Sequence, residues 1–593
     1  MSDEADQPLE LLRMVVKKEL AHHLESLPSF KEMIIDETLF KTLDMFTTTS
    51  YLMKRGVKKF LKFKKTPDCY VWDENITIRV FFVRPTAENA RLVCQQIEKQ
   101  PDRKHAIIWA HRASEPCNME IEQCGLYERV QIFELNMSLL PIETDLFTLN
   151  LAESALLDLH SVASTFVALQ SLYGTVPTVY GLGKEVRKMW SLAQILCENN
   201  EPRARPDQPI SHLFIFDRSI DPVSVLLTGG TYEALLHDTF GIDSGKITRS
   251  KEKQEGAPAA FCRSDDPAAD GSVRLSNNDD MFASIRNKYI SAVLPFLSSK
   301  LKETLATSES STGTVKGMLN FVEGGLREYI VNKNVLAMHF AACELIIAKF
   351  AKEDYKTRSS LEHSLFRKQV DMVDFMKFLE ERMLSGEDCW TILSLACLAT
   401  IANSGIPDSH YRLFVRRFVR IYGYNYVNVF YNLRGWGLLY CQSQAKKHDK
   451  IRRSSETFEK MAKRLHSVQG DEEIDLKNPA DMSYVFGGRF SPILCQIVEE
   501  TMTKGWNTTE YKKLFGDDVL VEENSYTPAN SRPDNRMKKA IMVFFLGGVT
   551  YAEVAALRLL AIQKNFRIII GTTHVIRKDE YLSIRGHSPA AVY

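Results

Sequence analysis

Short, continuous runs of apolar residues recur in two widely separated parts of this chain. The runs in the N-terminal half are "TIRVFFVRP" (77–85), "AIIWA" (106–110), "RVQIFE" (129–134), "TVPTVYG" and "HLFIF". The others come near the C-terminus, as "MSYVF" (482–486), "IMVFFLGG" (541–548) and "FRIIIGTTHVI" (566–576). Continuous apolar runs that alternate with helical patterns are typical of buried parallel strands. The chain is therefore predicted to contain α/β domains with parallel sheets.

The long stretch between these two groups of strands is helical in pattern. Two long helical patterns, joined by the polar turn "ATSESSTGT", predict a hairpin, and residues 361–466 continue almost wholly helical. The simplest arrangement returns the C-terminal strands to the sheet that contains "HLFIF", so that the helical stretch is an all-α insertion. The predicted domains are an α/β domain (1–140), a discontinuous α/β domain (141–245 and 475–593), and a helical domain (246–474) made of a hairpin (280–352) and a helical block (353–474).

Bulk properties exclude several classes of protein. The chain has 593 residues with 75 basic and 75 acidic side chains, so its overall charge does not favour nucleic-acid binding. Its eleven cysteines include no Cys-x-x-Cys pair, which argues against disulfides and structural zinc. The N-terminus is acidic, unlike a secretory signal, and the longest uncharged apolar stretch (540–552) is too short to span a membrane. We expect a soluble, cytoplasmic protein without metal or cofactor, whose membrane contact is peripheral.

No motif in the sequence supports enzymatic chemistry. The segment "GLGK" (181–184) resembles part of a phosphate loop, but Thr178 and Glu185 occupy the positions that need Gly and Ser or Thr. The chain has no His-Glu-x-x-His, no Gly-x-Ser-x-Gly and no G-x-G-x-x-G. Gly181 and Gly183 are therefore predicted to form a turn, and the protein is predicted not to be an enzyme.

Asp217, Arg218 and Asp221 follow the predicted strand "HLFIF" directly. Ligands of open parallel sheets collect at the carboxyl ends of strands, so this cluster is a candidate active site. An arginine between two carboxylates keeps both ionised, whereas acid–base catalysis by a pair needs one protonated and one ionised group. We therefore predict a structural ion cluster that holds the strand-to-helix crossover.

The same residues begin a pattern that resembles a known family. Asp-Arg-x-x-Asp, an apolar stretch and Thr-Tyr-x-x-x-x-x-Asp resemble the signature of the SM (Sec/Munc-type) family, whose members bind SNAREs in membrane fusion. "VFFLGGVTYAEVAALRLL" and "FRIIIGTTHVI" resemble its C-terminal strand–helix–strand segment, and "FFVRP" and "LQSLYGTVP" resemble landmarks of its first two domains. "LLTGGTYEALLHD" and "DMSYVFGG" are most similar to the vacuolar protein sorting-associated protein 33 class, and "LYGTVP" and "FFLGGVT" favour its A type over its B type.

The resemblance implies both a fold and a function. The fold has three domains around an arch, with a discontinuous parallel-sheet middle domain and a helical hairpin. The implied function is that of a SNARE-binding chaperone of tethering and fusion at late endosomes and lysosomes, within a class C vacuolar protein sorting (HOPS/CORVET-type) complex. SNARE helices would bind through apolar anchors at helical spacing and charged rims. The predicted rim residues on the hairpin are Arg286, Lys288, Lys316 and Arg327.

A second partner implied by the resemblance is an α-solenoid tethering subunit of the vacuolar protein sorting 16 type. The segment "YRLFVRRFVRIYGYNY" (411–426) is rich in Arg and Tyr, which are enriched at interface hot spots. Tyr424 matches the aromatic position of the family's docking site, whereas Val415 stands where a lysine is expected. The predicted docking residues are Arg416, Arg417, Arg420 and Tyr424.

The segment "KRGVKKFLKFKK" (54–65) holds seven basic residues interleaved with apolar ones. It is interpreted either as the end of an amphipathic helix with a solvated basic face, or as a site that attracts anionic lipid or an acidic partner. Attraction to a membrane would contribute about 1 kcal/mol per basic residue near the surface.

Two other functions remain open at this point. A B-type endosomal sorting subunit that acts as a scaffold would bind the tether but no SNARE, and it would share the same fold. An α/β enzyme with a site near Asp217 would instead have a small-ligand pocket beside unpaired carboxylates. The fusion-chaperone hypothesis predicts carboxylates closed around Arg218.

Overall fold

The structure of the chain is a computed structural model with two compact units. Unit 1 comprises Met1–Leu151 with Asp243–Lys246, and unit 2 comprises Ala152–Ile242 with Ile247–Tyr593. The residues that the structure describes are 8–64, 70–137, 139–149, 158–198, 210–248, 272–275, 279–311, 326–352, 355–447, 449–470, 474–523 and 540–587.

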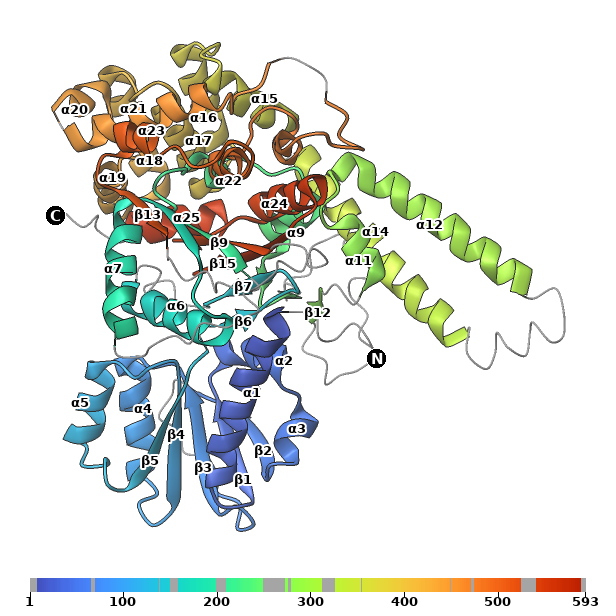
Figure 1. The fold of residues 1–593 in the computed structure, drawn as a ribbon, viewed down its shortest axis with the longest axis vertical. Helices are drawn as coiled ribbons and strands as arrows, with labels where there is room; N and C mark the ends of the chain where they lie inside the picture. Colours follow the sequence, from blue (N-terminus) through green and yellow to red (C-terminus); the bar gives the residue numbers. More distant parts are fainter. Residues whose placement is uncertain are drawn as a thin grey trace, which may run out of the picture. The chain divides into compact units, whose positions relative to one another are not determined.

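Unit 1 is built on a five-stranded parallel sheet of order β2-β1-β3-β4-β5 (Figure 1). Its strands are β1 (Lys31–Ile35), β2 (Val57–Lys62), β3 (Ile78–Val83), β4 (Lys104–Ala110) and β5 (Val130–Leu135), followed by the short β6 (Leu140–Pro141) and β7 (Leu146–Thr148). Its helices are α1 (Pro8–Ser26), η2 (Glu37–Leu39), α2 (Phe40–Phe46), α3 (Thr49–Met53), α4 (Ala87–Glu98) and α5 (Glu115–Gln123). The strands predicted at 77–85, 106–110 and 129–134 are confirmed as β3, β4 and β5.

Helices cover both faces of this sheet, and each face has its own apolar core. The side chains of β3 are buried at every position, because successive residues point to opposite faces and both faces are covered. Val80 and Phe82 belong to the core shared with α1 and α2, and Phe81 and Val83 belong to the core shared with α4 and α5. This explains why the strand appears in the sequence as a continuous apolar run.

The sheet of unit 2 combines strands from both ends of that unit's sequence. The order is β13-β8-β9-β14-β15, in which β8, β9, β14 and β15 run parallel and the edge strand β13 is antiparallel. The strands are β8 (Thr178–Leu182), β9 (Ile210–Asp217), β13 (Val519–Glu523), β14 (Ala540–Leu546) and β15 (Arg567–Thr572). The helices beside them are α6 (Leu159–Tyr173), α7 (Lys184–Glu198), α8 (Val223–Leu226), α9 (Tyr232–Phe240), α22 (Ile493–Lys504), α23 (Thr508–Phe515), α24 (Tyr551–Lys564) and α25 (Lys578–His587).

One strand prediction for unit 2 is wrong, and one strand of unit 2 was not predicted. "MSYVF" is not a strand but the 3-10 helix η5 (Met482–Phe486). Its start is capped by the Asp481 side chain, and it ends at Gly487 in the left-handed conformation. The edge strand β13 was not predicted, because "VLVEE" lacks the continuous apolar pattern of a strand buried on both faces.

The described part of the stretch between the two groups of unit 2 strands is mostly helical. It contains α11 (Asp280–Ile285), α12 (Ile290–Ser311), α14 (Leu326–Lys352), α15 (Tyr355–Phe366), α16 (Met372–Leu384), α17 (Cys389–Ala402), α18 (Asp408–Tyr422), α19 (Tyr426–Gly435), α20 (Gln442–Lys447) and α21 (Asp449–Arg464), after the short strands β10 (Ile242–Asp243), β11 (Lys246–Thr248) and β12 (Ser272–Arg274). Helices α12 and α14 lie side by side (Figure 1). The predicted boundaries of the middle and helical domains stay a prediction.

One segment of α14 has the composition of a membrane-crossing helix. Lys333–Ala351 has a mean hydropathy of 1.4, and 33% of it is buried within the protein. Length and composition alone are weak evidence, because core helices of globular proteins share them.

Candidate functional site

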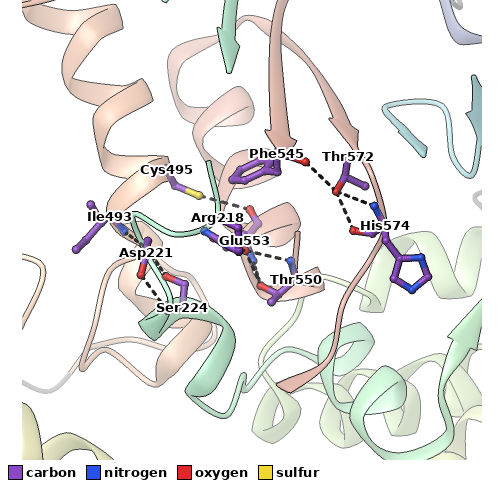
Figure 2. Close-up of polar contacts among 10 residues, drawn as sticks. All are labelled: Arg218, Asp221, Ser224, Ile493, Cys495, Phe545, Thr550, Glu553, Thr572 and His574. Carbon is purple, nitrogen blue, oxygen red and sulfur yellow. Dashed lines mark hydrogen bonds and ion pairs between the residues drawn. The ribbon is translucent and has the colours of Figure 1, made fainter. Parts of the chain in front are cut away.

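The strand β9 is followed by a buried arginine that forms an ion pair with the helix α24. Arg218 is fully buried, and its Nη1 donates to the two carboxylate oxygens of Glu553 at 2.8 Å and 2.7 Å. The register of β9 and β14 sets Asp217 beside Leu546, the last residue of β14. Because α24 follows β14 closely, Glu553 in its first turn reaches the residue after β9. Figure 2 shows the two side chains pointing toward one another.

Glu553 also caps the helix on which it lies. Its backbone N–H donates to Thr550 Oγ1 at 3.2 Å, while its Oε2 accepts from the N–H and the hydroxyl of Thr550, both at 3.0 Å. This reciprocal pair is a capping box, which satisfies backbone donors that a helix start leaves free. Burial raises the pKa of the Glu553 carboxyl, and Arg218 opposes that shift by favouring the ionised form. One carboxylate thus serves both the arginine and the helix start.

The two aspartates of the predicted cluster are bound by neutral groups. Asp217 Oδ1 accepts from the N–H of Ser219 at 2.8 Å. Asp221 accepts from the N–H and the hydroxyl of Ser224 at 3.0 Å and 2.6 Å, and from the N–H of Ile493 at 3.1 Å (Figure 2). Ile493 is the first residue of α22. Asp221 therefore joins the crossover after β9 to the start of a distant helix.

The predicted pairing within the cluster of Asp217, Arg218 and Asp221 is wrong. Among the described residues, the ion pair of Arg218 is with Glu553, and Asp221 attracts it only at longer range. Glu553 lies 335 residues further along the chain, so no pattern around Arg218 identifies it. The spacing Thr-x-x-Glu at 550–553 predicts a helix cap and is the one local signal that could have drawn attention to Glu553.

This geometry fits a role in holding these elements together better than it fits a catalytic role. The carboxylates of Asp221 and Glu553 are occupied by protein donors from three different elements, so together they fix the crossover, α22 and α24. Within the described part of the chain, no group of three or more His, Cys, Asp or Glu side chains is placed to hold a metal ion.

The glycines of "GLGK" are needed for packing. Gly183 has a φ of +115°, and a Cβ there would lie 2.3 Å from the Cβ of Asp217. At Gly181 a Cβ would lie 2.8 Å from Cγ1 of Val186. These contacts account for both glycines without a phosphate ligand, as the missing phosphate-loop positions already suggest.

Replacing Gly183 by Ala should lower the free energy of unfolding of unit 2 by about 2 to 3 kcal/mol, because it combines a strained φ with overpacking. Urea denaturation followed by circular dichroism measures this change. Gly470→Ala is the control, since nothing lies within 4 Å of a Cβ at that position. Equal unfolding midpoints for the two variants would contradict the close packing described here.

The predicted docking segment (411–426) comprises most of α18, a tight turn and the first residue of α19. Phe414 and Phe418 of α18 are buried, so the other side of this helix faces away from the core. Arg416 and Arg420 are exposed, and Tyr424 in the turn is 83% exposed. The structure therefore presents these three predicted docking residues at the surface.

Four other large apolar side chains of the same two helices are also exposed. Leu413 and Ile421 of α18, and Val427 and Tyr431 of α19, are all exposed despite their size. The fourth predicted docking residue, Arg417, is only partly exposed and forms an ion pair with Glu380 of α16. We define the α18–α19 surface as Leu413, Arg416, Arg420, Ile421, Tyr424, Val427 and Tyr431.

The predicted SNARE-binding residues differ in their surroundings. Arg286 is buried, and its guanidinium donates twice to Glu233 of α9, at 2.9 Å and 2.5 Å, so the prediction of an exposed rim residue is wrong. Its partner lies 53 residues earlier, which the local helical pattern does not indicate. Lys288 is partly exposed, with its Nζ 5.1 Å from the ring centre of Phe296. Lys316 and the side chain of Arg327 lie outside the described residues.

Comparisons with known proteins find similarity along nearly the whole chain. The sequence matches the Sec1 family over residues 31–583. It is 45% identical to vacuolar protein sorting-associated protein 33B of Caenorhabditis elegans, over 100% of this chain and 98% of that protein. It is 26% identical to vacuolar protein sorting-associated protein 33A of Rattus norvegicus, over 98% of both. The fold is similar to that of the SM protein Vps45, solved in complex with the Qa SNARE Tlg2, with a TM-score of 0.60 at 15% identity over 97% of each chain.

These findings confirm the predicted SM fold and its resemblance to the protein 33 class. They do not support the preference for the A type, since a B-type relative is 45% identical and an A-type relative 26%. The two short segments that favour the A type are therefore too short to separate the types, and the type stays unresolved.

Proposed function

The chain belongs to the Sec1 family, and from this premise we propose that it is a SNARE-binding regulator of vesicle fusion and not an enzyme. The observation that carries the proposal is 45% identity with a protein 33B across the complete chain. A protein of the same fold binds a Qa SNARE, which supports the same ligand class for this chain. The internal bonding of Asp221 and Glu553 also favours binding over catalysis, since the enzyme hypothesis needs free carboxylates.

We further propose that the protein works as a subunit of a class C vacuolar protein sorting complex of the HOPS or CORVET type. In this role it is cytoplasmic and peripheral on late endosomes and lysosomes, held there by its partners. The support is the vacuolar sorting name of its relatives. A scaffold of a B-type endosomal sorting complex is the second candidate, favoured by the 45% identity to a B-type protein.

The α18–α19 surface is the proposed docking site for an α-solenoid tethering subunit of the vacuolar protein sorting 16 type. Interfaces commonly combine apolar and aromatic side chains at the centre with charged groups at the rim. Tyr424 and the exposed apolar side chains of α18 and α19 would form the centre of the interface. Arg416 and Arg420 would form its charged rim. Arg417 is less available because it is already paired with Glu380.

SNARE binding is tested with the purified full-length chain and a preassembled four-helix bundle containing a late-endosomal Qa SNARE. We expect saturable binding by calorimetry. Lys288→Glu should weaken it about 3- to 10-fold at low salt, because reversing a rim charge adds repulsion that salt screens. Lys513→Glu, at an exposed position of α23, is the control and should leave the affinity unchanged.

This binding experiment separates the SNARE-binding regulator from the scaffold. A chain that binds the solenoid subunit but no SNARE bundle is the scaffold. Binding that is lost equally in the Lys288 and Lys513 variants would reflect net charge alone and would remove the hairpin from the proposed SNARE site.

A further inference from the structure

The basic segment 54–64 contains β2, which is the edge strand of the unit 1 sheet among the residues that the structure describes. The predicted amphipathic helix end is wrong, because β2 (Val57–Lys62) occupies most of the segment and is the outermost strand in the order β2-β1-β3-β4-β5. The other interpretation, attraction of anionic lipid or an acidic partner, stays a prediction. We define the basic edge as Lys54, Arg55, Lys58, Lys59, Lys62 and Lys64. Of these, Lys54, Lys58, Lys62 and Lys64 are exposed.

The apolar residues of this segment are used by the protein's own cores. Val57 is fully buried in one core, with Phe60 packed against it, and Phe63 is buried in the core on the other face, with Leu61 packed against it. None of these side chains is free to enter a bilayer. Attraction of this segment to a membrane would therefore depend on its basic side chains alone.

Positive charge dominates the basic edge. The described acidic partners are Glu25 with Arg55 at 3.3 Å, Glu32 with Lys59 at 3.9 Å, and Glu37 with Lys62 at 3.4 Å. Glu32 is itself held more closely by the buried Arg79, at 2.9 Å. Six basic residues thus face three acidic ones. The pair of Glu37 and Lys62 is largely exposed, so water competes with it strongly.

The basic side chains lie on both faces of the strand. Successive residues of a strand point to opposite faces. Lys62 therefore shares the face of Phe60, and Lys59 shares the face of Leu61. A strand placed beside β2 would have side chains on both faces within reach of a lysine, whereas a flat membrane meets only one plane.

The backbone of β2 also presents hydrogen-bonding groups outward. Phe63 N–H donates to Ile35 of β1 at 2.8 Å, and Ile35 lies opposite Lys62 in the parallel register. In this register Lys59, Leu61 and Phe63 bond toward β1, so the backbone groups of Phe60 and Lys62 point away from it.

The Tyr70 hydroxyl occupies the outward backbone groups at the C-terminal end of β2. It donates to the carbonyl of Lys62 at 2.9 Å and accepts from the N–H of Lys64 at 2.6 Å. The N–H and carbonyl of Phe60 and the N–H of Lys62 remain directed away from the sheet. A partner strand could take three backbone hydrogen bonds from these groups.

From this geometry we infer that β2 binds an extended, acidic segment of a partner protein as an additional strand of the unit 1 sheet. Backbone bonding supplies the alignment, and lysines on both faces select glutamate and aspartate. The same lysines also discourage pairing with identical chains, which is a known protection of sheet edges. These lysines attract acidic side chains, so an acidic strand can pair with this edge where an identical, basic strand is repelled.

The test uses a fluorescein-labelled peptide of about eight residues, made of Glu, Thr and Val with glutamates on both faces of its extended form. Anisotropy with the full-length chain should show saturable binding that weakens about 10-fold or more as salt rises to about 0.15 M. A second peptide, with proline at alternate positions, cannot form the backbone bonds and should not bind.

Two substitutions at Lys62 separate the contribution of its charge to binding from that of its backbone N–H. Lys62→Gln removes the charge and keeps the N–H, while Lys62→Pro removes both without touching a bond to β1. The proline variant should bind about 5- to 10-fold more weakly than the glutamine variant. Lys18→Gln, at an exposed position of α1, is the matched control and should bind as the unchanged protein does.

Several results would overturn the inference. Equal binding of the two peptides, or of the two Lys62 variants, would show attraction without strand addition. Binding to phosphatidylserine vesicles but not to the acidic peptide would make the edge a membrane contact. Binding to neither would leave it a protective edge only. Should Lys62→Pro fail to fold, the proline peptide makes the same test from the ligand's side.

Discussion

Replacing Arg218 by Ala should lower the free energy of unfolding of unit 2 by about 3 to 5 kcal/mol, because it leaves the buried Glu553 carboxylate without its counter-charge. The loss is large because Glu553 also caps α24. Without Arg218, the Glu553 carboxylate should become protonated or move, and either change disturbs the start of the helix. Urea unfolding of the purified chain, followed by circular dichroism, measures the change.

A double replacement shows whether the loss comes from the unpaired charge. Arg218→Met with Glu553→Met removes both charges and keeps apolar volume, so it should be clearly less destabilising than Arg218→Ala alone. A much smaller loss in the double variant would show that the cost of Arg218→Ala comes from the unpaired Glu553 charge. An Arg218→Ala variant that melts normally but no longer binds SNAREs would instead make the cluster a functional site.

Replacing Tyr424 by Asp should weaken docking on the solenoid tethering subunit about 100-fold or more, since it places a charge at the centre of a surface that binding would desolvate. Tyr424 is 83% exposed in the chain by itself, so the variant should fold normally. Co-purification of the complex gives the first readout, and surface plasmon resonance gives the affinity.

Charge reversals on α18 test the rim of the same surface. Arg416→Glu and Arg420→Glu should mainly slow association and change its salt dependence, because both side chains are exposed. Arg417→Glu should act differently, since it also breaks the ion pair with Glu380 and repels that carboxylate. If Tyr424→Asp and all three reversals leave the affinity intact, the α18–α19 surface is not the docking site.

The strands were the most predictable part of this fold. Runs such as "IRVFFV" and "AIMVFFL" are buried at every position, as expected for strands covered on both faces. "MSYVF" has a similar composition but forms a 3-10 helix, because the caps at Asp481 and Gly487 decide the conformation of a short apolar run. Apolar content by itself therefore overpredicted one strand.

The partners of buried charges were the least predictable part. Arg218 was correctly placed at the end of a strand, but its partner Glu553 comes from a helix that only the sheet order brings near. Arg286 follows the pattern of a solvated helix position, yet Glu233 makes it a buried ion pair. In both cases the sequence shows the charge, and only the tertiary fold shows its counter-charge.

The arrangement of the unit 2 sheet has a consequence for synthesis on the ribosome. The strand β9 pairs with β14, and Arg218 is separated from Glu553 by 335 residues. At translation rates of about 5 to 20 residues per second, roughly 15 to 70 s pass between the emergence of the two charges. During that time one flank of β9 has no strand beside it and its arginine has no counter-ion. The nascent chain therefore exposes this strand edge until β14 and α24 emerge and complete the sheet, and such an edge favours aggregation.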